Sequence, residues 1–480
     1  MSRAASASGM LGKFYRPADT AGIPLAPPGR RCMRGGMKHL FPAIRGLLPL
    51  WHRTALAVPV ALAAGSLTAL FLWALDRVTE IHWAHPALLW ALPPAGMMVG
   101  YLYQVWGKGS EKGNNLIIDE IHQPDAGVPL RMAPLVLIGT LVTHLFGGSA
   151  GREGTAVQMG GSLAGGLARW FRVGAENRRI MLMCGIAAGF GAVFGTPLTG
   201  AVFAIEVLVL GKMQYDAFLP VLTAGIVGDA TCTAWGIRHT AYHLDVPANA
   251  GTHAPFEALL LVKIAAAAAA FGLAAMLFCG LTHRLQRGFA TLSARAPMRP
   301  LLGGVIVIAL TVLLGTRDYL GLGVQAPPQG TVSILTSFEE GGADPLSWLW
   351  KTVFTSVTVA SGFKGGEVTP LFFIGSTLGN AMGQLLNGPA ALFAALGFVA
   401  VFSGAANTPM ACTLMGIELF GAHYAVYFAV ACFIAYYSSG HAGIYSAQRA
   451  GIPKNTTAAV RAATVRHVSG HEENSRGRNS

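Results

Sequence analysis

The chain has 480 residues, of which 53% are hydrophobic and only 12% are charged. Soluble globular proteins carry about 25% charged residues, so this composition excludes an ordinary soluble domain and indicates a chain whose solvent is largely lipid. The formal net charge is +12, and much of the excess lies before the first apolar stretch and after the last one.

The basic ends predict where the termini lie. Residues 1–46 are basic and lack an apolar core, so they do not resemble a secretory signal and are expected to be disordered. Residues 451–480 form a short basic tail. Because cytoplasmic flanks of membrane proteins are enriched in Lys and Arg, both termini are expected in the cytoplasm. A nucleic-acid patch is not favoured, because no aromatic residue or folded module accompanies the charges.

Seven apolar stretches are the clearest candidate spans. Several reach the roughly 20 residues that cross a bilayer, whereas others are shorter and are interrupted by Gly and Pro. Short, broken segments predict helices that end inside the membrane, which is tolerated only where protein or a water-filled cavity covers the free backbone groups. The stretches are residues 56–75, 86–103, 133–146, 180–194, 256–279, 301–314 and 398–419.

The two halves of the chain resemble each other at a shift of about 212 residues. A Thr-Pro pair at 196–197 is followed by Glu206, and a Thr-Pro pair at 408–409 is followed by Glu418. Two further pairs of segments match in the same order. Residues 185–188 resemble 397–400, and the G-x-E-x-T motif at 151–155 recurs at 365–369. Repeated halves with broken helices are typical of transporters whose substrate site lies near the midplane. The predicted repeats are residues 47–240 and 255–450, joined by a linker at 241–254.

The first G-x-E-x-T motif has the chemistry of an anion site. Gly151 and Gly154 flank Glu153 at a predicted helix start, where unpaired N–H groups attract anions. An ionisable group in the apolar zone is a functional candidate by default. As a carboxylate, Glu153 competes with an anion for the N–H groups; once protonated, it leaves and carries the proton. The alternative is a structural glutamate paired with Arg152.

Other polar residues of the apolar zone carry weaker signals. Glu367 repeats the chemistry of Glu153 in the second half, and Thr369 is expected to bond an anion, to cap a helix, or both. Tyr445 can donate a hydrogen bond to an anion from the cytoplasmic side, although a tyrosine after a last span is more often an interfacial residue.

Four further residues are expected to be structural. Glu206 and Glu418 are expected to anchor neighbouring backbone N–H groups. His144 and Lys351 are expected to be packing or snorkelling residues rather than ligands. The segment 113–116 reads as an ordinary loop and helix cap.

These motifs resemble those of one family, the CLC anion channels and transporters. Gly151-Arg152-Glu153-Gly154 is similar to the family's G-R-E-G motif, and residues 113–117, 365–370 and 443–447 take the places of its other conserved segments. The resemblance covers residues 47–450. It implies an all-α polytopic CLC fold, with two inverted-topology repeats of tilted and partial helices, and a homodimer with one pore per subunit. Cytoplasmic CBS domains are expected to be absent, since only about 35 residues follow Tyr445.

Departures from the family's usual motifs point to one branch. Asn114 stands where serine is usual, Thr155 replaces a proline, and Val368-Thr369 replaces a segment with phenylalanine. This set is similar to the fluoride/proton antiporter branch, often called CLC-F. The resemblance implies fluoride export driven by inward proton flow across a bacterial inner membrane. Donors close to the anion are expected from the backbone or side chains of Asn114, Gly154, Val368, Thr369 and Tyr445.

One position of the usual proton route is changed. Many chloride/proton exchangers of the family have two adjacent glutamates where this chain reads Glu206-Val207. The second glutamate, which would relay protons from inside, is therefore missing. Glu367, related to Glu153 by the repeat, is the hypothesised replacement, so Glu153 and Glu367 are the expected gating and proton-coupling residues.

Two alternatives remain beside the fluoride/proton antiporter. The first is a chloride/proton exchanger or passive chloride channel of the same family, against which the motif departures argue. The second is an intramembrane enzyme using His144 and Glu153, but no nucleophile–base pair or metal spacing supports it. The six cysteines imply neither disulfides nor zinc. The expected partners are fluoride or chloride, protons, membrane lipid and a second subunit, with no cofactor and no nucleic acid.

Overall fold

The computed structural model describes residues 36–242, 244, 258–327, 330–452 and 454, and the side chains from residue 49 onward. Residues 50–480 form one compact unit, to which all that follows refers. Most of the predicted basic leader, linker and tail lies outside the described residues.

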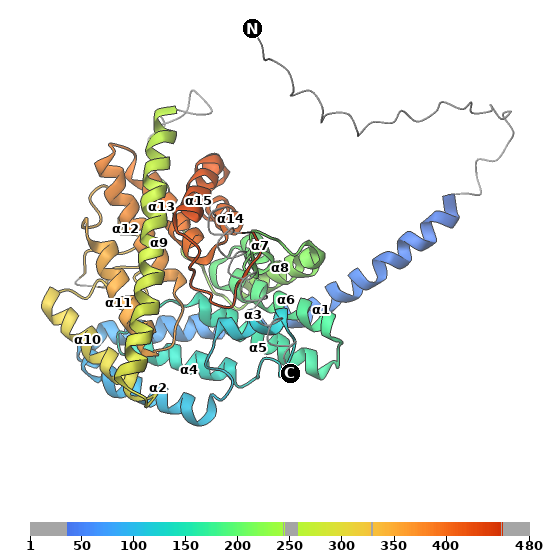
Figure 1. The fold of residues 1–480 in the computed structure, drawn as a ribbon, viewed down its shortest axis with the longest axis horizontal. Coiled ribbons are helices and arrows are strands. Elements are labelled where there is room, and N and C mark those ends of the chain that lie inside the picture. Colours follow the sequence, from blue (N-terminus) through green and yellow to red (C-terminus); the bar gives the residue numbers. More distant parts are fainter. Residues whose placement is uncertain (1–35, 243, 245–257, 328–329, 453, 455–480) are drawn as a thin grey trace, which may run out of the picture. The chain divides into compact units, whose positions relative to one another are not determined.

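Helices dominate the described part of the chain (Figure 1). The first half contains α1 Gly36–Ala84, α2 Leu92–Trp106, α3 Asn114–His122, α4 Met132–Leu145, α5 Glu153–Trp170, α6 Ala175–Phe194, α7 Pro197–Glu206 and α8 Phe218–Ala234. The second half contains α9 Ala258–Leu292, α10 Met298–Leu314, α11 Ser347–Ser361, α12 Val368–Leu385, α13 Ala390–Ala406, α14 Pro409–Phe420 and α15 Ala425–Ser438. Short 3₁₀ turns lie at Pro86–Ala91, Tyr215–Ala217, Thr336–Phe338 and Ala422–Tyr424, and strands β1 Val209–Leu210 and β2 Arg449–Ala450 pair in parallel.

The helices differ widely in length. Among the described residues, three helical segments are long and apolar enough to cross a membrane: Pro49–Ala84, Tyr215–Ala234 and Ala258–Leu292. By contrast α7 has 10 residues, which at 1.5 Å per residue cover about half of a 30 Å hydrocarbon core. The apolar stretch 398–419 is divided between two helices, because Asn407 adopts a left-handed conformation (φ 59°) and Pro409 starts α14. Broken helices are therefore a feature of this fold, as the sequence predicts.

Equivalent glycine pairs hold two equivalent helix pairs together. Helix α5 crosses α6 where Gly160 meets Gly185, and α12 crosses α13 where Gly375 meets Gly397. A Cβ on Gly160 would lie 2.1 Å from the Gly185 carbonyl oxygen, and one on Gly375 would lie 2.0 Å from the Gly397 carbonyl oxygen. Small residues permit such close backbone approach between apolar helices. The two contacts are related by the shift that relates the two halves of the sequence.

Helices α7 and α14 are joined by two reciprocal carboxylates. Glu206, at the end of α7, accepts the N–H groups of Met410 and Ala411 at the start of α14, at 3.0 and 2.8 Å. Glu418, in the last turn of α14, accepts the N–H groups of Leu198 and Thr199 at the start of α7, at 2.9 and 2.7 Å. Each carboxylate thus satisfies the free N–H groups of the other helix. The prediction that both glutamates anchor backbone N–H groups is confirmed.

Candidate functional site

The two G-x-E-x-T motifs meet in space. The N–H of Gly151 donates to the carbonyl of Gly366 and the N–H of Gly366 donates to the carbonyl of Gly151, both at 2.6 Å. This antiparallel bridge holds the start of α5, at Glu153, beside the start of α12, at Val368. A Cβ on Gly366 would lie 2.8 Å from the Gly154 nitrogen, so only glycine fits the crossing. The free N–H groups of two helix N-termini are therefore concentrated in one buried region.

Glu153 lies at the centre of this region and is fully buried. Its carboxylate accepts the backbone N–H of Thr369 at 3.0 Å and the Thr369 hydroxyl at 2.6 Å. It also accepts the N–H of Arg152 at 3.2 Å, and the Arg152 Nε atom lies 3.6 Å from it. The structure supports both interpretations of Glu153. The carboxylate contacts Arg152, as a structural glutamate would, and it also accepts hydrogen bonds from the α12 donors for which an anion would compete. Those donors are ones that an anion can use only when the carboxylate moves away.

Thr369 is not the cap of its helix, so that part of the sequence prediction is wrong. Helix α12 begins at Val368 and the cap position belongs to Glu367, which makes no side-chain capping hydrogen bond. Thr369 is the second helical residue, and its hydroxyl turns to Glu153 instead. Val368 is buried beside it. Glu367 is half-buried, and its carboxylate makes no hydrogen bond within the part of the chain that the structure describes.

A small cavity lies on the other side of the α5 start. It is lined by residues of four helices together with Val207 and Tyr445: Asn114, Ile118, Val157, Ile186, Phe203, Val207 and Tyr445. Gly113 (φ 56°) turns the chain so that α3 begins at Asn114, and a Cβ on Gly154 would lie 3.0 Å from the Asn114 amide nitrogen. The amide oxygen of Asn114 is buried without a hydrogen-bond partner in the described part of the chain. The structure therefore brings Asn114 and Gly154 together beside Tyr445.

Tyr445 is not an interfacial tyrosine. It is only 8% exposed, and its ring packs edge-on against Phe203 with centroids 6.1 Å apart. Val207, at the position of the missing second glutamate, lines the same cavity and is buried. The interfacial interpretation fails because the segment after α15 folds back onto the helices, as its β2 strand pairs with β1.

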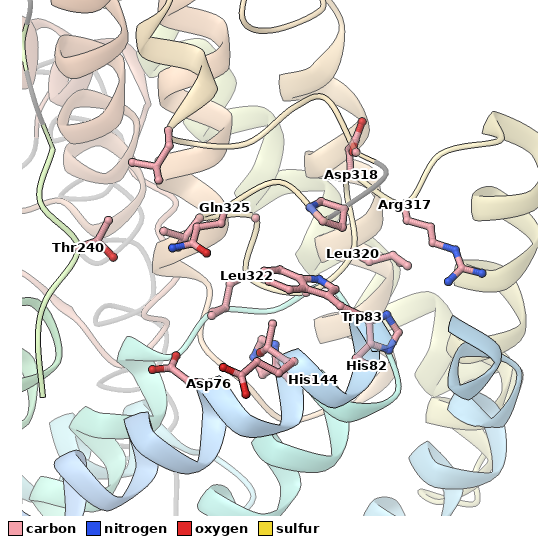
Figure 2. A pocket seen from close by; sticks show the side chains of 18 of the residues that line it. Asp76, His82, Trp83, His144, Thr240, Arg317, Asp318, Leu320, Leu322 and Gln325 are labelled. Atoms are coloured by element: carbon pink, nitrogen blue, oxygen red, sulfur yellow. The ribbon is translucent and has the colours of Figure 1, made fainter. Parts of the chain in front are cut away.

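A second, larger cavity of about 720 Å³ lies beyond Arg152 (Figure 2). Its wall is made by the end of α1, the end of α4, Arg152 and two loops, which contribute residues 238–241 and residues within 315–327 and 330–335. Figure 2 shows Asp76, His144, Leu322 and Gln325 around this space. The sequence analysis missed this cavity, because its wall comes from segments that lie far apart in the chain and share no motif.

Of the two alternatives expected for His144 and Lys351, packing in the interior is confirmed and snorkelling is not. Lys351 does not snorkel: it is fully buried, and its ammonium donates to the carbonyls of Tyr319 at 3.2 Å and Gly321 at 2.9 Å. It is enclosed because the 319–321 backbone folds over it and satisfies its donors. His144 is buried at 2% exposure but lines the large cavity rather than only filling the core.

The fold and this site define a polytopic membrane protein in which two helix N-termini meet at a buried glutamate. The chain belongs to the voltage-gated chloride channel family, here called CLC, whose family model matches residues 95–440. Members of this family are channels and transporters, so the protein is a transporter or channel and not an enzyme. Its CLC fold agrees with the resemblance found in the motifs.

Individual relatives agree with this assignment. The chain is 50% identical, over 84% of its length and 87% of the relative's, to a "Chloride/fluoride channel protein" of Pseudomonas syringae pv. tomato. It is 27% identical to a "Putative chloride channel protein ClcB-like" of Ralstonia nicotianae, over 76% of the chain and 85% of the relative. Among solved structures, a CLC-type fluoride/proton antiporter matches with a TM-score of 0.78 and 33% identity, covering 84% of this chain and 98% of that one. A slow cyanobacterial Cl⁻/H⁺ antiporter matches in fold, with a TM-score of 0.67 and 20% identity over 81% and 94% of the two chains.

Proposed function

We propose that this protein exchanges fluoride for protons, exporting fluoride from the cytoplasm while protons flow inward. The observation that carries the proposal is the position of the Glu153 carboxylate, which accepts hydrogen bonds from the N–H and the hydroxyl of Thr369 at the start of α12. An anion competes for the same donors, and protonation weakens the hold of the carboxylate on them. Release of protonated Glu153 then exposes an anion site, so one side chain couples the two ions.

Fluoride is the anion that the donors suit best. A small, strongly hydrated anion loses much hydration energy on entry, so it needs several close donors. The structure offers Asn114, the N–H of Gly154 and Tyr445 on one side of the α5 start, and Thr369 with the N–H of Val368 on the other. The similarity to a chloride/fluoride channel protein and to a fluoride/proton antiporter supports the same choice.

The inner part of the proton route is assigned to Glu367. Val207 supplies no ionisable group at the small cavity lined by Asn114 and Tyr445, whereas Glu367 precedes α12 and makes no hydrogen bond to the described residues. Replacing Glu367 with Gln keeps its shape and removes its proton, so this variant should lose part or all of its coupling. Full coupling in Glu367→Gln contradicts this assignment.

We further propose a homodimer in a bacterial inner membrane, with repeats at 47–240 and 255–450 and both termini in the cytoplasm. The basic residues before α1 and after α15 favour this orientation. The spanning segments of the described chain and the membership of the family support the membrane location.

Purified protein in liposomes tests the transport function directly. Vesicles loaded with fluoride should release it and take up protons when the fluoride gradient is the only driving force. Chloride-loaded vesicles should show far smaller flux. Replacing Glu153 with Gln should abolish proton uptake, because the gate no longer carries a proton. Equal chloride flux would favour a chloride exchanger or channel, and pumping that persists in Glu153→Gln would remove Glu153 from its role.

A further inference from the structure

With the termini in the cytoplasm, as proposed above, the large cavity beyond Arg152 opens on the opposite side of the membrane. Basic residues precede the spanning segment Pro49–Ala84 in the sequence, and the end of this segment lines the cavity, so one crossing separates the two. A second, independent argument comes from the turn between α9 and α10, which is rich in arginine as cytoplasmic turns are. Helix α10 leads from this turn to the cavity-lining loop at Gly315, so the cavity again lies one helix away from the cytoplasmic side. The basic residues of this region are Arg284 and Arg287 near the end of α9, Arg295 between the helices and Arg299 at the start of α10. Protons that drive an exporter therefore arrive in this cavity.

His144 is the one buried histidine of the cavity wall, within the described residues, whose ring has no partner. It lies in the last turn of α4, is 2% exposed, and neither ring nitrogen makes a hydrogen bond. By contrast, the Nδ1 atom of the buried His82 lies 3.0 Å from the Leu145 carbonyl oxygen; His239 is only half-buried, and its Nε2 atom lies 3.4 Å from Asp229 without a hydrogen bond. Leaving a buried donor and acceptor unpaired costs about 1–3 kcal/mol each, so both nitrogens are expected to serve ions or water in the cavity.

The cavity reaches the residue next to the gate but not the gate itself. Arg152 lines the cavity, and its Nε atom lies 3.6 Å from the Glu153 carboxylate. Glu153 is fully buried and is not part of the cavity wall. A proton in the cavity therefore needs a group that accepts it on one side and releases it on the other. A neutral imidazole has one acceptor nitrogen and one donor nitrogen, which is the requirement for such a step.

The other charged groups of the wall leave the cavity close to neutral. Three carboxylates and three guanidinium groups line it, and the buried Lys351 lies behind the 319–321 backbone. Opposite charges in equal number hold neither a departing anion nor an arriving proton strongly. The histidines then set how the cavity's charge changes with pH. The groups that face His144 across the wall are Asp76, Glu80, His82, Arg152, Arg238, His239, Arg317 and Asp318.

We propose that His144 is the proton relay between the outer cavity and Glu153. This inference rests on the proposed fluoride/proton exchange and adds the route by which the proton enters. The ring takes up a proton from the cavity on its acceptor nitrogen and releases the proton of its other nitrogen toward Glu153. Tautomer exchange or ring rotation then restores the starting state.

The test measures proton-coupled fluoride flux of the full chain in liposomes at several external pH values. His144→Ala should slow coupled flux about tenfold or more, since positioned acid–base groups contribute about 10²- to 10⁴-fold and cavity water replaces part of this. Imidazole added outside should restore the rate in His144→Ala, with a pH dependence set by imidazole, and should leave the wild type unchanged. Proton-independent fluoride/fluoride exchange should stay near the wild-type rate.

Control variants separate this role from others. His82→Gln changes a histidine of the same wall that already bonds to a carbonyl, so its coupled flux should stay within about twofold of the wild type. A rate loss in His144→Ala that imidazole does not restore would mean a structural role. Full activity in His144→Gln, whose amide donates but does not relay protons, would mean an anion donor instead. Absence of proton movement in the wild type would instead refute the exchange function itself.

Discussion

At the scale of single residues, the site depends on glycines that have no space for a side chain. The crossing of Gly151 and Gly366 brings the backbones of the two motifs together through two hydrogen bonds of 2.6 Å. Gly366 does not have a left-handed φ, so what excludes a side chain there is the neighbouring Gly154 nitrogen, 2.8 Å from a Cβ. A methyl group at this position must push the start of α5 away from the start of α12.

We therefore expect Gly366→Ala to reduce fluoride transport about tenfold or more, because displacement of catalytic geometry by about 1 Å has effects of that size or larger. Gly280→Ala is the matched control, since nothing lies within 4 Å of a Cβ there. Alanine in the interior of a helix is more favourable than glycine by about 1 kcal/mol, so the control should transport normally and be slightly more stable. Flux assays and thermal unfolding of both variants check this, and normal transport by Gly366→Ala would contradict it.

At the scale of elements, short helices are stabilised by their ends. Helix α7 has only 10 residues and α14 has 12, too few for stability on propensity alone. Each receives a carboxylate from the other at its N-terminus, through Glu206 and Glu418. Because these bonds join the two halves of the chain, they also fix how the halves meet.

Replacing Glu206 with Gln should lower stability by about 2 kcal/mol, because two charge-assisted bonds are weakened and an amide NH₂ faces backbone N–H groups. Glu340→Gln changes an exposed glutamate and should have almost no effect. Thermal unfolding in detergent compares the two variants, and the apparent Tm of Glu206→Gln should fall by several degrees. An unchanged Tm would show that the reciprocal bonds do not contribute to stability.

At the scale of the whole molecule, the proposed orientation requires the two cavities to face opposite sides of the membrane. The cavity with His144 is lined by the end of α1, and the one with Asn114 and Tyr445 lies near the starts of α3 and α5. Glu153 is fully buried and lines neither cavity. On the proposed function, movement of this one side chain would expose the anion site alternately to the two sides.

Cysteine labelling in intact cells tests this orientation. The cysteines of the described residues are all buried, so with Cys32 replaced by Ser the background should be low. Gln325→Cys, at an exposed position of the large cavity, should react with an impermeant maleimide from outside. Lys112→Cys, equally exposed near α3, should react only after the cells are permeabilised. The reverse pattern would place the large cavity on the cytoplasmic side.

The sequence by itself determined the membrane setting, the broken helices, the repeat and the candidate residues around Glu153. These follow from composition, local turn chemistry and motif spacing, which act over short stretches of chain. It also identified Glu206 and Glu418 as anchors of backbone N–H groups, because a paired glutamate after each Thr-Pro turn has few other uses.

Only the tertiary structure decided which hydrogen-bonding groups pair with one another and which side chains are buried. The Thr369 hydroxyl bonds to Glu153 from 216 residues away, Tyr445 is buried rather than interfacial, and Lys351 is enclosed by carbonyls of a loop. The outer cavity and the unpaired ring of His144 likewise come from segments without a shared motif. The physical reason is that burial and hydrogen-bond partners depend on packing between distant segments, whereas a sequence pattern records only the preferences of neighbouring residues.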